Sequence, residues 1–148
     1  MQLRVLVADD QMPVRLLCRL ELQAAGMEIL EAEDGLRALE LATGSDRPDA
    51  ILLDVKMPGL DGWDVAEALL DDPSTSGIPI ILFSAEAGFA ERARRTEIGG
   101  VGYLTKPFDP EAEGLAAMVK RLVAGARQGT RDERRRELLA ALRERLAH

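Results

Sequence analysis

The chain has 148 residues, a hydrophobic share of 47% and a formal net charge of −7, values typical of one soluble globular domain with a buried core. Aromatic residues make up only 3% of the chain, which argues against an aromatic platform for single-stranded nucleic acid. Residues 1–126 carry 12 basic and 22 acidic side chains (net −10), and residues 127–148 carry 7 and 4 (net +3). Because the acidic body would repel nucleic acid, we do not expect this chain alone to bind it.

The chain contains one cysteine, so no disulfide can form within it. This residue, Cys18, falls among leucines and is expected to be a small buried hydrophobe. No apolar run is long enough to predict a membrane span, and the first residues do not resemble a signal peptide. We therefore expect a cytoplasmic protein that does not contact membranes.

Strands and helices alternate in the first half of the chain. An apolar, β-branched run over residues 3–8 predicts a strand, and Pro13 suits the first turn of the helix that follows. A second strand is predicted over 27–32, then a short helix ending near Gly44, then a fully apolar strand over 50–54. The apolar residues at helical spacing predict the buried face of the first helix: Leu16, Leu17, Leu20 and Ala24.

The second half continues the alternation. A loop rich in Pro, Gly and Asp over 55–62 leads into a helix, and the next strand is predicted over 78–84. A weak, charged helix over about 87–97 precedes a fifth strand over 101–105, and a last helix is predicted from Pro110 to Gly125. Five alternations with short connections indicate an α/β fold, a doubly wound parallel sheet with helices on both faces.

Polar side chains stand where the predicted strands end: Asp9 and Asp10 after the first strand, Asp54 in the third, Ser84 in the fourth and Lys106 after the fifth. Because the carboxyl ends of parallel strands share one edge of a sheet, we expect these five side chains to lie close together. Three neighbouring carboxylates repel one another, and Mg²⁺ would resolve the repulsion. A carboxylate such as Asp54 can act as a nucleophile toward a phosphoryl group, which Lys106 and Ser84 would stabilise.

At this point the chain resembles a known family, the receiver domain of two-component response regulators of the chemotaxis-regulator type. The resemblance runs from about residue 3 to residue 124. Each motif alone is weak, but all of them occur in order and at strand ends. The matching pieces are Val7-Ala8-Asp9-Asp10, Asp54 with Met57-Pro58 and Asp61-Gly62, Phe83-Ser84-Ala85, and Tyr103-Leu104-Thr105-Lys106-Pro107-Phe108.

The resemblance implies a flavodoxin-like sheet of order 2-1-3-4-5 with five helices. It implies that Asp54 accepts a phosphoryl group from a sensor histidine kinase or a histidine phosphotransfer protein. It further implies Mg²⁺ as the cofactor, with Asp9, Asp10, Asp54 and the backbone carbonyl of Lys56 as protein ligands. Such a protein is a signalling switch rather than a metabolic enzyme, although it assists its own phosphorylation and dephosphorylation.

The resemblance also assigns roles to residues around the acids. Ser84 and Tyr103 match the family's switch pair, and the output surface for a downstream protein is the fourth helix, fifth strand and fifth helix, here about residues 87–124. Lys56 and Glu86 occupy positions that tune the phosphoryl lifetime, and we hypothesise that an ion pair between them hinders the attacking water; two solvated side chains are the alternative. The family further implies a cis bond between Lys106 and Pro107.

Simpler structural roles compete with some of these assignments. Asp9 could cap a helix, Ser84 could be a turn hydroxyl, Tyr103 could be a fixed strand residue, and Lys106 an ordinary surface lysine. A receiver that has lost phosphorylation is a further alternative, although every required group is present.

Two other function classes are considered. A Mg²⁺-dependent phosphohydrolase or phosphotransferase could use Asp54 as its nucleophile, but such enzymes usually carry a second Asp two residues later, where this chain has Lys56. A flavodoxin would need a hydroxyl-rich phosphate loop after the first strand, where this chain has the acids Asp9 and Asp10.

The receiver domain is expected to span residues 1–125, followed over 126–148 by a short linker and a C-terminal amphipathic helix. Residues 130–133 fit a capping box, and the helix is predicted to have about four to five turns. Its leucines recur at helical spacing opposite three arginines: Leu138, Leu139, Leu142 and Leu146 opposite Arg134, Arg135 and Arg136. The helix could pack on the receiver or pair with a second copy, begin a linker to an output domain, or bind a partner. A homodimer could form through this helix or through the output face.

Overall fold

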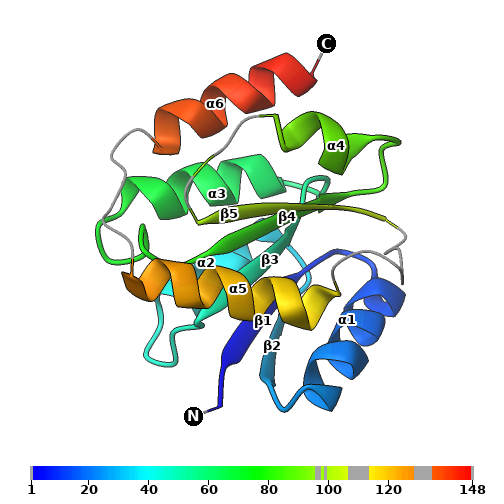
Figure 1. Cartoon of the computed structure of the whole chain (residues 1–148), viewed down its shortest axis with the longest axis vertical. Coiled ribbons are helices and arrows are strands. Elements are labelled where there is room, and N and C mark those ends of the chain that lie inside the picture. The colour runs from blue at the N-terminus through cyan, green and yellow to red at the C-terminus, as the bar shows by residue number, and fades with distance from the viewer. Residues whose placement is uncertain (1, 96–97, 99, 107–113, 129–134, 148) are drawn as a thin grey trace.

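The computed structural model describes residues 2–95, 98, 100–106, 114–128 and 135–147. Over these ranges, five parallel strands form one sheet with the order β2-β1-β3-β4-β5, which confirms the predicted flavodoxin-like topology (Figure 1). The strands are β1 (Arg4–Ala8), β2 (Glu28–Ala32), β3 (Ala50–Asp54), β4 (Ile80–Ser84) and β5 (Val101–Thr105).

Helices cover both faces of this sheet. They are α1 (Met12–Ala24), α2 (Gly35–Thr43), α3 (Gly62–Asp71), α4 (Phe89–Ala93), α5 (Leu115–Gln128) and α6 (Arg135–Leu146). The apolar residues of α1 and α5 pack on one face of the sheet, and those of α2, α3, α4 and α6 belong to the core on the other face. In Figure 1, α6 lies outermost, across α3 and α4. No helix among the described residues combines the length and the apolar character that crossing a bilayer requires.

The central strand β3 explains how the acid Asp54 comes to be buried. All five of its residues are buried, because β1 and β4 flank it and helices cover both of its faces. The continuous apolar run Ala50–Leu53 satisfies both faces, as expected for an inner parallel strand. Asp54 ends the strand and is only 6% exposed.

The predicted buried face of α1 is wrong. Leu17 and Leu20 are 62% and 56% exposed, whereas Cys18 and Leu22 are fully buried against the sheet. The leucines and the residues that contact the core both recur at helical spacing, so periodicity alone could not decide which face is buried. The expectation that Cys18 is a buried hydrophobe is confirmed.

Several helix boundaries also differ from the predictions. Helix α4 spans only Phe89–Ala93, shorter than the predicted 87–97. Helix α5 does not begin at Pro110, since Gly114 is not helical, and it continues past Gly125 to Gln128. The expected capping box at residues 130–133 lies outside the described residues. The described part of α6 has 12 residues, about three turns.

The buried face of α6 also differs in part from the prediction. Arg135 is only 9% exposed, so it does not share a solvated face with Arg136 as predicted. Leu139 and Leu142 are buried within the same chain, at 0% and 1% exposure. Their burial favours packing on the receiver over pairing with a second copy, because a coiled coil would need these leucines at its seam.

A glycine fixes the distance between β3 and α3. A Cβ atom added to Gly62 would clash with the backbone carbonyl oxygen of Asp54 and lie 2.9 Å from the Cα atom of Val55. We expect Gly62→Ala to lower the free energy of unfolding by about 2 kcal/mol, because backbone atoms must move to admit the methyl group. Urea denaturation followed by circular dichroism would measure this. Gly77→Ala is the control, since nothing lies within 4 Å of its added Cβ atom; equal losses in both variants would contradict the explanation.

Candidate functional site

The five polar residues predicted at strand ends meet at one edge of the sheet. A pocket of about 230 Å³ opens there. Its lining residues come from the last positions of β3 and β4 and from the loops after β1, β3, β4 and β5: Asp10, Gln11, Asp54, Lys56, Ser84, Ala85, Glu86 and Lys106. Asp9 lies beneath them and is fully buried.

Asp9 is held from two sides. Its Oδ1 accepts a hydrogen bond from the backbone N–H of Gln11 at 2.8 Å, and its Oδ2 lies 2.6 Å from the ammonium nitrogen of Lys106. The backbone of Asp9 is fixed as well, because its carbonyl oxygen accepts a hydrogen bond from Arg15 at 2.6 Å. Gln11, not Asp9, is the N-cap residue of α1, so the helix-cap alternative for Asp9 does not hold.

Lys106 reaches into the acidic cluster rather than into solvent. Its Nζ lies 3.5 Å from Oδ2 of Asp54 as well as beside Asp9, and only 14% of its side chain is exposed. The ammonium also stands over the ring of Phe83, 4.4 Å from the centroid, where the aromatic face attracts a cation. A surface role for Lys106 is therefore wrong, whereas its predicted position beside Asp54 is correct.

The three carboxylates are close enough to share a metal ion. One carboxylate oxygen from each of Asp9, Asp10 and Asp54 lies within 4.8 Å of the other two. Hard oxygen donors of this kind suit Mg²⁺, which typically takes one or two carboxylates and keeps several waters. Asp10 is exposed, so water can reach the outer side of the cluster. The donor set thus fits the predicted cofactor.

The electrostatics of the site act most strongly on Asp54. Burial and, to a smaller extent, the negative charge of Asp9 raise the pKa of this carboxyl to about 6, although the Lys106 ammonium and the Lys56 backbone N–H act in the opposite direction. A divalent cation would favour the ionised form. Asp54 is therefore a carboxylate whose charge is poorly compensated, and which gains from any cation that enters the cluster.

The predicted switch residues are both buried. Ser84 is 3% exposed, and its Oγ accepts a hydrogen bond from the backbone N–H of Glu86 at 3.1 Å. Tyr103 is 5% exposed and ends a row of three aromatic rings in which Trp63–Phe89 and Phe89–Tyr103 are edge-to-face pairs with centroids 6.3 Å apart. Burial raises the pKa of the Tyr103 hydroxyl, partly offset by the charge of Arg145. The movement expected of this pair remains a prediction.

The remaining predicted residues are less constrained. Lys56 and Glu86 are both exposed, and within the described ranges no ion pair joins them. The backbone N–H of Lys56 donates to Oδ1 of Asp54 at 3.3 Å. The role of the Lys56 carbonyl as a metal ligand stays a prediction. The predicted cis bond involves Pro107, which lies outside the described residues.

One connection at the site was not anticipated. The Thr105 Oγ1 accepts a hydrogen bond from the backbone N–H of Ala90 at 2.8 Å, and this bond joins the end of β5 to the first turn of α4. A hydroxyl directly before Lys106, at a strand end, was the available sequence signal. This contact means that the backbone around Lys106 and the helix α4 are mechanically linked.

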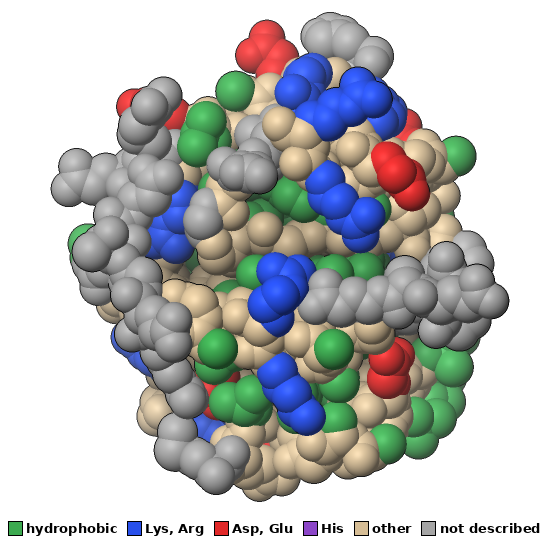
Figure 2. Space-filling model, viewed as in Figure 1, with side chains coloured by type: hydrophobic (Ala, Val, Ile, Leu, Met, Phe, Trp, Pro, Cys, Tyr) green, Lys and Arg blue, Asp and Glu red, His purple; other side chains and the backbone are tan. Residues whose placement is uncertain are grey.

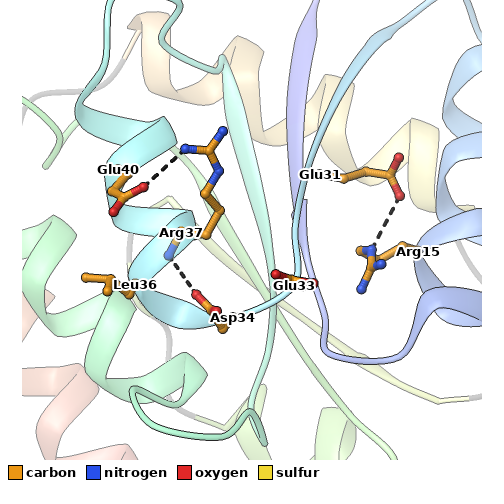
Figure 3. Close-up of a pocket in the computed structure, with 7 residues that line it drawn as sticks. All are labelled: Arg15, Glu31, Glu33, Asp34, Leu36, Arg37 and Glu40. Atoms are coloured by element: carbon orange, nitrogen blue, oxygen red, sulfur yellow. Dashed lines mark hydrogen bonds and ion pairs between the residues drawn. The ribbon is translucent and has the colours of Figure 1, made fainter.

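A second hollow of about 450 Å³ lies between α1, β2 and α2 (Figure 3). Its two arginines already have acidic partners: Arg15 pairs with Glu31 at 3.4 Å, and Arg37 pairs with Glu40 at 3.1 Å. The backbone N–H of Arg37 donates to Asp34, which caps α2. These internal contacts explain both arginines of the hollow and three of its four acidic residues without a ligand.

Comparison with known proteins agrees with the geometry. The sequence model of the response regulator receiver domain matches residues 5–120. The chain is 46% identical to the response regulator PleD of Caulobacter vibrioides over 110 residues, which are 74% of this chain and 24% of PleD. It is 42% identical to the response regulator MprA of Mycobacterium ulcerans over 118 residues, which are 80% of this chain and 49% of MprA. The chain thus spans about a quarter of the length of PleD and about half of the length of MprA.

A solved structure shows the same arrangement. The chemotaxis response regulator CheY4 of Vibrio cholerae superposes with a TM-score of 0.69 at 32% sequence identity, covering 82% of this chain and 99% of that one.

Proposed function

The chain belongs to the response-regulator receiver family, and from this we propose that it is a phosphorylation-operated signalling switch with Asp54 as the phosphoacceptor. The observation that carries the proposal is the cluster itself. Three carboxylates meet within 4.8 Å, and an ammonium group lies 3.5 Å from the central one. This combination suits a reaction in which an anionic group approaches a carboxylate.

In the proposed reaction, an oxygen of Asp54 attacks the phosphorus of a phosphohistidine. The phosphorus–nitrogen bond breaks, the imidazole nitrogen keeps the electron pair, and an aspartyl phosphate forms. Mg²⁺, held by Asp9, Asp10, Asp54 and the Lys56 carbonyl, would neutralise phosphoryl charge. Lys106 would supply a second positive charge, and the Ser84 hydroxyl would donate a hydrogen bond to a phosphoryl oxygen.

The donor would be a sensor histidine kinase or a histidine phosphotransfer protein, which must reach the pocket. Helix α1 begins directly after Gln11, which lines the pocket. This helix exposes the apolar side chains of Met12, Leu17 and Leu20, at 59%, 62% and 56%. Exposed apolar side chains beside a reactive carboxylate suit the docking of a protein donor.

The output would pass through α4, β5 and α5 to a downstream protein. Ser84 links the pocket to α4 through the N–H of Glu86, and Thr105 links β5 to α4 through the N–H of Ala90. If the Ser84 hydroxyl turns toward a phosphoryl group, its bond to Glu86 must change, and the loop leading to α4 moves with it. A homodimer through the output face remains a prediction. We do not propose the hydrolase alternative, because Lys56 stands where a carboxylic acid would be needed.

Intact mass after incubation with acetyl phosphate and Mg²⁺ tests the proposal. We expect a gain of one phosphoryl group that requires Mg²⁺ and disappears in Asp54→Asn. Asp46→Asn is the matched control, since it removes an exposed carboxylate away from the pocket. A gain that persists in Asp54→Asn would place the acceptor elsewhere. No gain of phosphoryl mass from acetyl phosphate or from a phosphohistidine donor, together with no binding of beryllium fluoride, would contradict the function.

A further inference from the structure

Helix α6 is an addition to the five-helix doubly wound fold, and it is firmly seated. Leu139 and Leu142 are buried in the same core cluster as Phe89 and Tyr103. Arg135 is buried too, and its guanidinium donates to the backbone carbonyl of Ser76 in the loop before β4. The helix therefore combines an apolar contact with a fixed polar one.

One arginine of α6 binds the start of α3. Arg143 lies 2.9 Å from Asp64 and 3.1 Å from Asp61, with Glu67 at 3.5 Å. Asp61 and Asp64 form the capping box of α3. This box closes the loop that begins at Asp54, and the N–H of Gly62 donates to the carbonyl of Val55 at 3.1 Å. Arg143 is thus connected to the phosphoacceptor by one short, well-bonded segment.

The far end of α6 contacts α4. Arg145 donates to the carbonyl oxygen of Arg92 at 3.3 Å, and its charge acts on the hydroxyl of Tyr103. On the face shown in Figure 2, Lys and Arg side chains gather toward the top of the view, where Figure 1 places α4 and α6. The contacts of α6 therefore join α3, α4 and the neighbourhood of Tyr103.

We propose that α6 is an intramolecular strap that stabilises the arrangement of α3 and α4 belonging to unmodified Asp54, and that phosphorylation of Asp54 releases it. The inference rests on the proposed function. While α6 is docked it covers part of the face that α4 contributes to the output surface, so docking opposes output.

Docking of α6 and modification of Asp54 are thermodynamically linked in this proposal. The contact from Arg145 to Arg92 and the packing of the buried leucines in the core cluster that contains Phe89 fit α4 in its present position. Any state in which the Ser84 loop draws α4 elsewhere loses part of them. A segment that binds one of two states more tightly shifts the equilibrium toward that state, and the effect is reciprocal. Weakening α6 should therefore ease modification of Asp54, and modification of Asp54 should loosen α6.

Hydrogen exchange on the full chain tests whether modification of Asp54 loosens α6. With Mg²⁺ and beryllium fluoride, which mimics a phosphoryl group on a carboxylate, amides in 135–146 should exchange at least about fivefold faster than with Mg²⁺ alone. Asp54→Asn should show no such change. Unchanged protection of 135–146 in wild-type protein that demonstrably binds beryllium fluoride would overturn the strap.

A pair of matched variants tests whether weakening the contacts of α6 eases modification of Asp54. Arg143→Gln removes the anchor on α3, whereas Arg136→Gln removes the same charge from an exposed pair with Asp71 on the same helix. Fluorescence of Trp63, the single tryptophan, reports beryllium fluoride binding. We expect half-saturation at about fivefold lower concentration in Arg143→Gln and no change in Arg136→Gln. Equal behaviour of both variants would overturn the strap.

The two proposals fail in different ways. If wild-type protein gains no phosphoryl mass and binds no beryllium fluoride, the proposed function is wrong, and the coupling falls with it. If wild-type protein binds beryllium fluoride, but neither the protection of α6 nor the affinity of Arg143→Gln changes, only the strap is wrong.

Discussion

Replacing Lys106 by Met should slow phosphorylation of Asp54 by about 100- to 1,000-fold, the usual loss when one preorganised group that stabilises developing charge is removed. Met keeps an unbranched apolar side chain of similar length but lacks the ammonium, which lies over the ring of Phe83 and 3.5 Å from Asp54. The same variant should bind Mg²⁺ more tightly, because Lys106 no longer competes for the oxygens of Asp9 and Asp54. Opposite changes in rate and metal affinity distinguish loss of charge stabilisation from general damage to the site.

Rates of acetyl phosphate incorporation, measured by intact mass at saturating Mg²⁺, and Mg²⁺ titrations followed by Trp63 fluorescence provide the two readouts. Lys120→Met is the control, because Lys120 is an exposed lysine on α5. If Lys106→Met lost Mg²⁺ binding together with the reaction, Lys106 would be needed to build the metal site, and the proposed role in charge stabilisation would be wrong.

Asp54→Asn should stabilise the metal-free protein by about 2–3 kcal/mol at pH 7.5 and change its stability little at pH 4. The pKa of Asp54 is about 6 in the folded protein against an ordinary 3.8, and each unit corresponds to about 1.4 kcal/mol. Since the pKa of Asp54 is raised in the folded protein, the unfolded chain releases this proton at a lower pH than the folded protein does. The wild type therefore loses stability as the pH rises from about 4 to about 6, and Asn, which carries no proton to lose, does not.

Urea denaturation with a chelator present, at pH 4 and pH 7.5, measures the difference. Asp72→Asn should behave in the opposite direction, because hydrogen bonds from the backbone and side chain of Ser74 lower the pKa of Asp72. A stabilisation by Asp54→Asn that is equal at both pH values would mean that the buried charge is not its cause. Addition of Mg²⁺ should stabilise the wild type and so reduce the difference in free energy of unfolding between wild type and Asp54→Asn at pH 7.5.

The site could be predicted from the sequence because each part of it follows a strand. Apolar runs located the strands, and parallel pairing then forced Asp9, Asp54 and Ser84 to one edge, whatever the details of packing. Lys106 reaches the same edge because β5 pairs with β4 in register, with Ser84 opposite Thr105. The position of each polar residue along its strand was enough to predict that these side chains meet at one edge of the sheet.

The helices were harder to predict, because their faces depend on contacts with distant residues. Periodicity favoured Leu17 and Leu20 on α1, yet the sheet buries Cys18 and Leu22. Docking of α6 depends on Arg143 meeting Asp61, which lies 82 positions earlier in the chain. Nothing near Arg143 in the sequence indicates such a partner, so the local pattern left several uses of the helix open.

The burial of Cys18 has a practical consequence for solution work. Packed between α1 and the sheet with no exposed surface, its thiol has a pKa raised to about 12, first by burial and then by the charges of Asp9 and Glu21. A thiol that stays protonated and enclosed reacts slowly with maleimides and oxidants. Cys18 therefore does not have to be removed before single-site labelling. A cysteine introduced on the exposed side of α6 would be the residue that accepts a spin label or fluorophore. Distances measured from this label would follow the helix through a phosphorylation cycle.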